Sequence, residues 1–170
     1  MMMTNSQVHP TWQLDLETGA LVLTPCPGTK DADLDASLTQ LKAQGVEAIV
    51  TALDSEELAS KNVSELGEKA QALGMQWFQI EIEDDCAPGT DFAAKWRVTS
   101  PVLHQIVDNG GKVAMHCMGG SGRTGLLAAH LLLEKSWDMN KIVQEVQALR
   151  PGAFTKAIQV EYINCVANSQ

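Results

Sequence analysis

The stretch HCMGGSGRTG places Cys117, Arg123 and Thr124 around a glycine-rich turn, with apolar runs before it (residues 113–115) and after it (residues 126–133). A thiolate is a strong nucleophile, and a guanidinium presents a fork of N–H donors that fits two oxygens of a phosphoryl group. Glycines allow successive backbone N–H groups to turn inward and bind an anion. These residue types at this spacing indicate a site where a cysteine attacks a bound oxyanion.

The helix predicted over residues 122–136 would begin at this turn. A helix N-terminus carries partial positive charge and free N–H donors, which attract a phosphate and favour an ionised thiol. A lone cysteine is most often a small buried side chain, and a lone glycine turn is an ordinary strand-to-helix connection. The combination of both with Arg123 favours the catalytic interpretation.

The same stretch resembles the signature HC-x5-R-[ST] of the cysteine-based protein tyrosine phosphatases. The resemblance implies that Cys117 is the nucleophile and forms a phosphocysteine intermediate. It also implies that Arg123 binds the phosphate and stabilises the transition state. Thr124 would donate a hydrogen bond to the thiolate, and His116 would help keep that thiol ionised. The loop would supply the phosphate-binding backbone N–H groups, which belong to Met118, Gly119, Gly120, Ser121 and Gly122.

Three acidic residues at positions 83–85 crowd a loop that follows a predicted strand. Cleavage of a phosphate monoester needs a proton for the leaving oxygen, and a carboxylic acid is a common donor. A solvated acidic turn is the alternative interpretation. Ile82-x-Asp84 followed by Pro88 resembles the general-acid loop of the phosphatase family. The resemblance implies that Asp84 is the acid and later activates the hydrolytic water, with Asp85 as the second candidate.

The likeness extends over residues 21–166, which are similar to the kinase-associated branch of the dual-specificity phosphatases, the cyclin-dependent kinase inhibitor 3 type. This branch implies a shallow pocket that accepts phosphoserine and phosphothreonine as well as phosphotyrosine. Gln159 resembles a family glutamine near the catalytic water, and Arg150 would support the signature loop. A reversible disulfide between Cys86 and Cys117 is a further hypothesis, because it would protect the thiolate from over-oxidation.

Strand and helix patterns alternate along the chain, which indicates an α/β fold with a mostly parallel central sheet and helices on both faces. Ligands of such sheets bind at the carboxyl ends of the strands, where Cys117 is expected. We expect a single dual-specificity phosphatase-like domain over residues 1–170, with residues 1–10 flexible. The predicted strands are two short ones within 12–24, then 46–52, 75–83 and 112–116. The predicted helices are 31–44, 64–73, 91–109 with a break at Pro101, 122–136, 139–149 and 155–167.

Composition limits the class of protein. The chain has 170 residues, of which 45% are hydrophobic and 19% charged, so it is expected to fold around one core. A net charge of -9 argues against nucleic acid or an anionic membrane as a standing partner. The sequence shows no signal peptide or membrane span, so we expect a cytoplasmic protein. Four cysteines without metal-type spacing predict reduced thiols, no metal and no cofactor.

The predicted function is hydrolysis of phosphotyrosine, and of phosphoserine or phosphothreonine, with a phosphorylated protein or peptide as partner. A phosphatase of a phosphoinositide or an RNA 5'-phosphate is the main alternative, although the loop carries no lysine for a polyanion. Rhodanese-like sulfurtransferases and arsenate reductases also use a cysteine in an anion loop, but their loops differ in length or position. A phosphoprotein-binding module without activity would normally lack the cysteine, the arginine or the acid.

Overall fold

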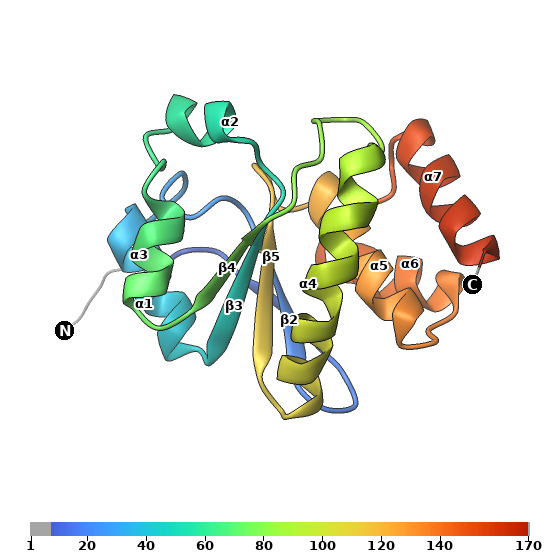
Figure 1. Cartoon of the computed structure of the whole chain (residues 1–170), viewed down its shortest axis with the longest axis horizontal. Coiled ribbons are helices and arrows are strands. Elements are labelled where there is room, and N and C mark those ends of the chain that lie inside the picture. The colour runs from blue at the N-terminus through green and yellow to red at the C-terminus, as the bar shows by residue number, and fades with distance from the viewer. Residues whose placement is uncertain (1–7, 170) are drawn as a thin grey trace.

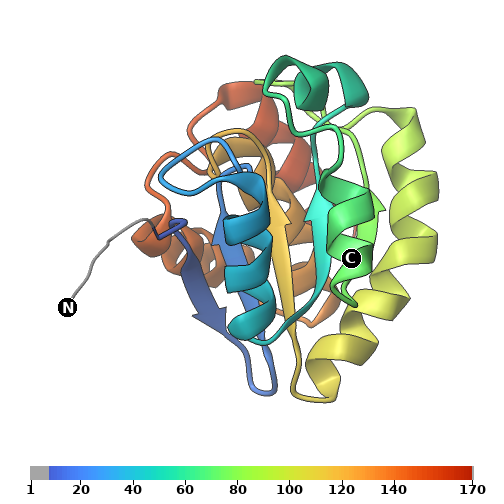
Figure 2. The same cartoon turned by 90° about the vertical axis from the view of Figure 1, so that its left-hand side faces the viewer.

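The structure, a computed structural model, describes residues 8–169. Its centre is a five-stranded sheet with the strand order β1-β2-β5-β3-β4 (Figures 1 and 2). The edge strand β1 is antiparallel to β2, and all other neighbours are parallel. The strands are β1 (Trp12–Asp15), β2 (Ala20–Thr24), β3 (Val46–Thr51), β4 (Gln76–Gln79) and β5 (Lys112–His116).

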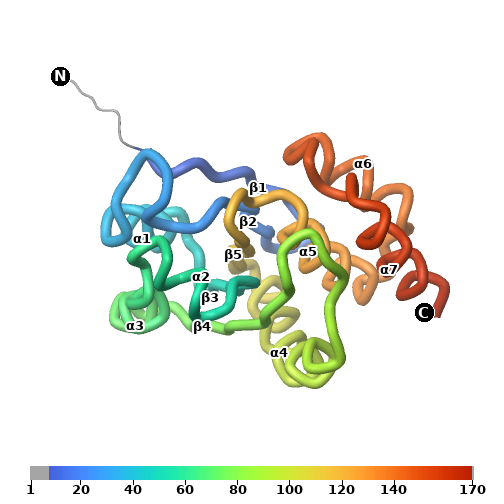
Figure 3. Tube along the Cα trace, turned by 90° about the horizontal axis from the view of Figure 1, so that it is seen from above, coloured from blue at the N-terminus to red at the C-terminus, as the bar shows by residue number. Residues whose placement is uncertain are grey.

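Helices cover both faces of this sheet. Seen from above, α1 and α3 lie on one side, and α4, α5, α6 and α7 lie on the other (Figure 3). The predicted α/β class with a mostly parallel sheet is therefore confirmed. The helices are α1 (Leu34–Ala43), α2 (Ser55–Ser60), α3 (Leu66–Ala72), α4 (Thr90–Asp108), α5 (Gly122–Glu134), α6 (Met139–Leu149) and α7 (Ala157–Asn168).

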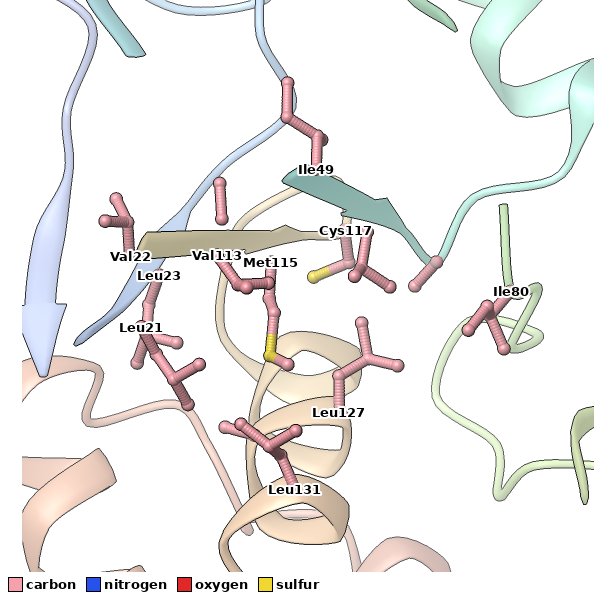
Figure 4. Packing of buried hydrophobic residues seen from close by; sticks show 14 of the residues in the cluster. Leu21, Val22, Leu23, Ile49, Ile80, Val113, Met115, Cys117, Leu127 and Leu131 are labelled. Atoms are coloured by element: carbon pink, nitrogen blue, oxygen red, sulfur yellow. The ribbon is translucent and has the colours of Figure 1, made fainter. Parts of the chain in front are cut away.

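One part of the buried core lies where the central strands meet α5. Strands buried on both faces of a parallel sheet consist of continuous apolar residues, and β2 and β5 have this pattern. Met115 of β5 points toward Leu127 and Leu131 of α5 (Figure 4). All three side chains are fully buried. Burial of each such side chain stabilises the fold by about 1.5–3 kcal/mol, so α5 and the turn before it have a rigid base.

Two predicted boundaries are wrong. The strand predicted over residues 75–83 ends at Gln79, the last residue paired in register with β3. Two backbone hydrogen bonds continue beyond it, from the N–H of Ile80 to the carbonyl of Thr51 at 2.8 Å and from the N–H of Ile82 to the carbonyl of Ala52 at 2.9 Å. The break predicted at Pro101 is also wrong, since α4 continues through it. A proline removes the N–H that would bond the carbonyl four residues earlier. Here that residue is Arg97, and both residues are exposed, so the freed carbonyl lies on the water-facing side.

The sequence pattern does not predict α2, because this helix buries only Leu58 and has no apolar repeat. Its start is fixed by a capping box between Asp54 and Glu57. The N–H of Glu57 donates to Asp54 Oδ1 at 2.8 Å, and the N–H of Asp54 donates to Glu57 Oε1 at 3.2 Å. The box holds the Glu57 side chain at the carboxyl end of β3.

The expectation of flexibility over residues 1–10 concerns mainly residues 1–7, which lie outside the described residues. His9 is fully buried instead, and its ring lies 2.6 Å from Thr24 Oγ1. Burial lowers the pKa of three histidines to about 4, so all are neutral at neutral pH; they are His9, His116 and His130. Within residues 8–169, no helix is long and apolar enough to cross a membrane.

Candidate active site

The loop between β5 and α5 surrounds the sulfur of Cys117 with hydrogen-bond donors. Cys117 follows the last residue of β5 and is 4% exposed. Its Sγ accepts the backbone N–H of Gly120 at 3.3 Å and the hydroxyl of Thr124 at 3.2 Å. Both donors point at the atom that would carry the negative charge of an attacking thiolate, and hydrogen bonds stabilise such a charge. The structure thus places Thr124 where the sequence prediction requires it.

Gly120 gives the loop its shape. Its φ is +81°, in the left-handed region that glycine adopts without strain. A Cβ at this position would lie 2.7 Å from the backbone nitrogen of Pro25 and 2.7 Å from the carbonyl carbon of Thr24. The loop therefore packs directly on the chain that leaves β2, and only glycine fits there.

Arg123 is held by an ion pair in which one of its nitrogens contacts both oxygens of a carboxylate. It is 2% exposed, and its Nη1 lies 3.0 and 2.9 Å from the two carboxylate oxygens of Glu57. The same nitrogen donates to the carbonyl of Ile82 at 3.0 Å. The hydrogen bonds of Nη1 are therefore made within the protein. The other terminal nitrogen, Nη2, lies 3.5 Å from Asp84 Oδ1, and Arg123 lines the pocket in which a phosphoryl group would bind.

Glu57 is a site residue that the sequence prediction misses. It lies 66 positions before Arg123, on a helix that has no apolar repeat to reveal it. The available signal is its place in the capping box, directly after a buried strand whose carboxyl end belongs to the ligand-binding edge. The ion pair with Glu57 holds the guanidinium of Arg123 in one orientation, which an arginine without a partner would not keep.

His116 contacts the backbone of the nucleophile and not its sulfur. Its Nδ1 lies 3.0 Å from the carbonyl oxygen of Cys117, and its Nε2 lies 2.7 Å from Thr51 Oγ1. Trp77 donates its indole N–H to the same Thr51 oxygen at 2.8 Å. Because burial lowers the pKa of His116 to about 4, this ring carries no positive charge at neutral pH. His116 instead fixes the peptide unit that carries the sulfur.

The two candidates for the general acid, Asp84 and Asp85, have different partners. Asp84 Oδ1 lies 3.5 Å from Arg123 Nη2, and its side chain is 69% exposed. Asp85 has a φ of +59°. Its Oδ1 lies 3.7 Å from the Nζ of Lys156, the residue directly before α7. Both residues line the pocket that contains Cys117. The geometry therefore favours Asp84 as the acid, because its carboxylate is the one beside the phosphate-binding arginine.

Gln159 joins the acidic loop to α7. It is 1% exposed, and its Nε2 donates to the carbonyl of Cys86 at 3.1 Å. Its Oε1 is buried without a hydrogen-bond partner and belongs to a residue that lines the pocket. The pocket has a volume of about 260 Å³. Its lining comprises Asp84, Asp85, Cys117, Met118, Gly119, Ser121, Gly122, Arg123, Gly152, Lys156 and Gln159.

The other predicted features lie outside this pocket. Cys86 has a free thiol and is not part of the pocket lining, and the disulfide with Cys117 stays a hypothesis. Among residues 8–169 there is no group of three or more histidine, cysteine or acidic side chains that could hold a metal ion.

A comparison with protein families decides the class. The family described as "Polymorphic toxin system, DSP-PTPase phosphatase" matches residues 26–136, which include the acidic loop and the cysteine loop. The chain belongs to this family of dual-specificity phosphatases. Membership confirms the predicted cysteine-based phosphatase superfamily and its dual-specificity branch.

Two relatives of known type are similar in sequence. Tyrosine-protein phosphatase CDC14 of Saccharomyces cerevisiae is 31% identical over 81 residues, which cover 47% of this chain and 14% of that protein. Cyclin-dependent kinase inhibitor 3 of Rattus norvegicus is 30% identical over 143 residues, which cover 82% of this chain and 66% of that protein. This phosphatase chain thus spans about a seventh of the yeast protein and about two thirds of the rat protein.

The fold is shared with a solved structure of kinase associated phosphatase in which the catalytic cysteine is replaced by serine. The TM-score is 0.85 at 24% identity, and the match covers 97% of both chains. A likeness at this identity concerns the fold. It confirms the predicted dual-specificity phosphatase fold for nearly the whole length of this chain.

Proposed function

We propose that this chain hydrolyses phosphate monoesters on proteins, at phosphotyrosine and at phosphoserine or phosphothreonine, through a phosphocysteine intermediate. One observation carries the proposal. The Sγ of Cys117 receives two hydrogen bonds, at 3.3 and 3.2 Å, in the same pocket that Arg123 lines. A nucleophile stabilised as an anion beside a fixed guanidinium is the arrangement that phosphoryl transfer requires.

In the first step, the Cys117 thiolate attacks phosphorus and forms the S–P bond. The bond between phosphorus and the substrate oxygen breaks, and this oxygen takes a proton from Asp84. Charge on the equatorial phosphoryl oxygens is stabilised by Arg123 and by the N–H groups of the loop. The dephosphorylated protein then leaves the pocket.

In the second step, water attacks phosphorus and the S–P bond breaks, which regenerates the thiolate and releases inorganic phosphate. The ionised Asp84 takes a proton from this water. The unpartnered Oε1 of Gln159, buried at the wall of the pocket, supports a role as a second acceptor that orients the water. A reduced thiol is essential to both steps, which supports the proposal of a cytoplasmic protein.

The test is hydrolysis of p-nitrophenyl phosphate and of phosphopeptides, with vanadate as inhibitor. We expect the wild type to turn over, Cys117→Ser to be inactive while still binding tungstate, and Asp84→Asn to lose about 10²–10⁴-fold in kcat. Asp85→Asn, which removes a pocket carboxylate with another partner, is the matched control. A larger loss in Asp85→Asn than in Asp84→Asn would overturn the assignment of the acid. No turnover in the wild type would contradict the proposal.

A phosphatase of phosphoinositides or RNA 5'-phosphates is the second candidate. The structure of PTPMT1 in complex with PI(5)P shares the fold, with a TM-score of 0.70 at 13% identity. The pocket of this chain has Lys156 as its one lysine, and that side chain faces Asp85. Anionic side chains beside the entrance disfavour a polyanionic substrate. Phosphate release from phosphopeptides but not from phosphoinositide vesicles or triphosphorylated RNA would exclude the second candidate.

A further inference from the structure

Arg150 holds two carbonyl groups of the phosphate-binding loop from outside the pocket. Its Nε donates to the carbonyl of Gly120 at 3.1 Å, and its Nη2 donates to the carbonyl of Gly119 at 2.8 Å. A trans peptide unit points its C=O and its N–H in opposite directions. Carbonyls tied to Arg150 therefore direct the next N–H groups, those of Gly120 and Ser121, toward the pocket. The contact of the Gly120 N–H with Cys117 Sγ, at 3.3 Å, agrees with this direction.

One face of the Arg150 guanidinium is covered by an aromatic ring. The Arg150 Cζ lies 3.8 Å from the ring centroid of Trp12. Trp12 is the first residue of the edge strand β1, where it pairs with Leu23 of β2. A planar guanidinium over an indole gains a cation–π attraction and keeps a fixed plane. The ring thus restricts Arg150 to the orientation in which both loop carbonyls are in reach.

The backbone around Arg150 also lies close to the loop. Arg150 is the residue directly after α6, with φ -130° and ψ 90°, and its carbonyl accepts the N–H of Ala153 at 3.0 Å. A Cβ added to Gly152 would lie 3.1 Å from the Cβ of Ser121. The segment after α6 is therefore packed on the loop, so that Arg150 reaches the carbonyls over a short and ordered path.

We infer that Trp12 and Arg150 act together as positioning residues that keep the N–H groups of the loop aimed at the phosphate. Neither residue lines the pocket, so neither touches a phosphoryl group bound there. They act through the orientation of two peptide units. The inference rests on the proposed function, and it adds a contribution of the edge strand to transition-state binding that the signature motif does not contain.

The test compares tungstate affinity, measured by calorimetry, with kcat on p-nitrophenyl phosphate. Arg150→Lys offers a single ammonium that cannot hold both carbonyls and lie flat on the ring, so we expect a loss of about 10- to 100-fold in both quantities. Trp12→Leu should lose about 3- to 10-fold, with Trp12→Phe between it and the wild type. The matched control is Trp137→Leu, which removes a second cation–π pair, with Lys141 at 4.1 Å, and should change neither quantity.

Thermal melting of each variant separates positioning from stability. A purely structural role would lower the melting temperature and leave the tungstate affinity of the folded protein unchanged, and this result would overturn the inference. Wild-type values of both quantities in Trp12→Leu would overturn it as well, even if Arg150→Lys does not fold. Tungstate binding does not depend on turnover. A wild type that binds tungstate but hydrolyses nothing would contradict the proposed function, while the affinities of the variants would still decide the inference.

Discussion

The ion pair between Glu57 and Arg123 gives a sharp test of how the site is held. Glu57→Gln keeps an acceptor at the third position of α2, so the capping box can still form, while the negative charge is lost. Hydrogen bonds to a charged partner contribute about 1.5–3 kcal/mol, and neutral ones contribute about 0.5–1.5 kcal/mol. Arg123 is 2% exposed and the Glu57 side chain is 27% exposed, so solvent screens the pair only in part.

We therefore expect Glu57→Gln to lower the free energy of unfolding by about 1–2 kcal/mol, as measured in urea. Because Arg123 would lose its fixed position, kcat/KM on p-nitrophenyl phosphate should fall about 10- to 30-fold. Asp54→Ala is the matched control, since it removes the helix cap, about 1 kcal/mol, and leaves the charge on Glu57. An equal loss of kcat/KM in both variants would refute the reasoning, because the effect would then come from α2 and not from the ion pair.

Two further predictions concern stability. The three buried histidines have a pKa lowered by burial from 6.5 to about 4, so between these values the unfolded chain binds protons that the folded chain does not. As the pH is lowered from 6.5 to 4, the free energy of unfolding should decrease, by at most roughly 4 kcal/mol per pH unit. A urea midpoint that stays constant from pH 7 to pH 5 would contradict this. Gly120→Ala should lower the free energy of unfolding, measured in urea, by at least about 1–2 kcal/mol. The alanine would be strained in the left-handed conformation, and its Cβ would clash with backbone atoms. In Gly119→Ala, whose Cβ would meet nothing within 4 Å, the free energy of unfolding should change by less than about 0.5 kcal/mol.

The nucleophile and its loop are predictable from sequence because they are local. Cys117, Arg123 and Thr124 stand within one strand–turn–helix unit, and the apolar runs that flank it determine its place in the sheet. Glycine content alone predicts a tight turn. It does not predict that Gly120 is the position pressed against the chain leaving β2, because that contact joins segments far apart in sequence.

The parts of the site that sequence does not predict are those made by long-range contacts. The partner of Arg123 is Glu57, 66 positions away on a helix too short for an apolar repeat. The charge state of His116 follows from complete burial, which a motif does not encode. The predicted strand continues too far because the buried Ile80 and Ile82 alternate with polar residues, although the regular pairing with β3 ends at Gln79.

The most direct test of the account is to find the covalent intermediate. The protein is mixed with a phosphopeptide, quenched in acid during turnover and digested, and the peptides are analysed by mass spectrometry. We predict one phosphoryl group on the peptide that contains Cys117, absent in Cys117→Ser. A phosphoryl group on another residue, or turnover by Cys117→Ser at the wild-type rate, would contradict the account.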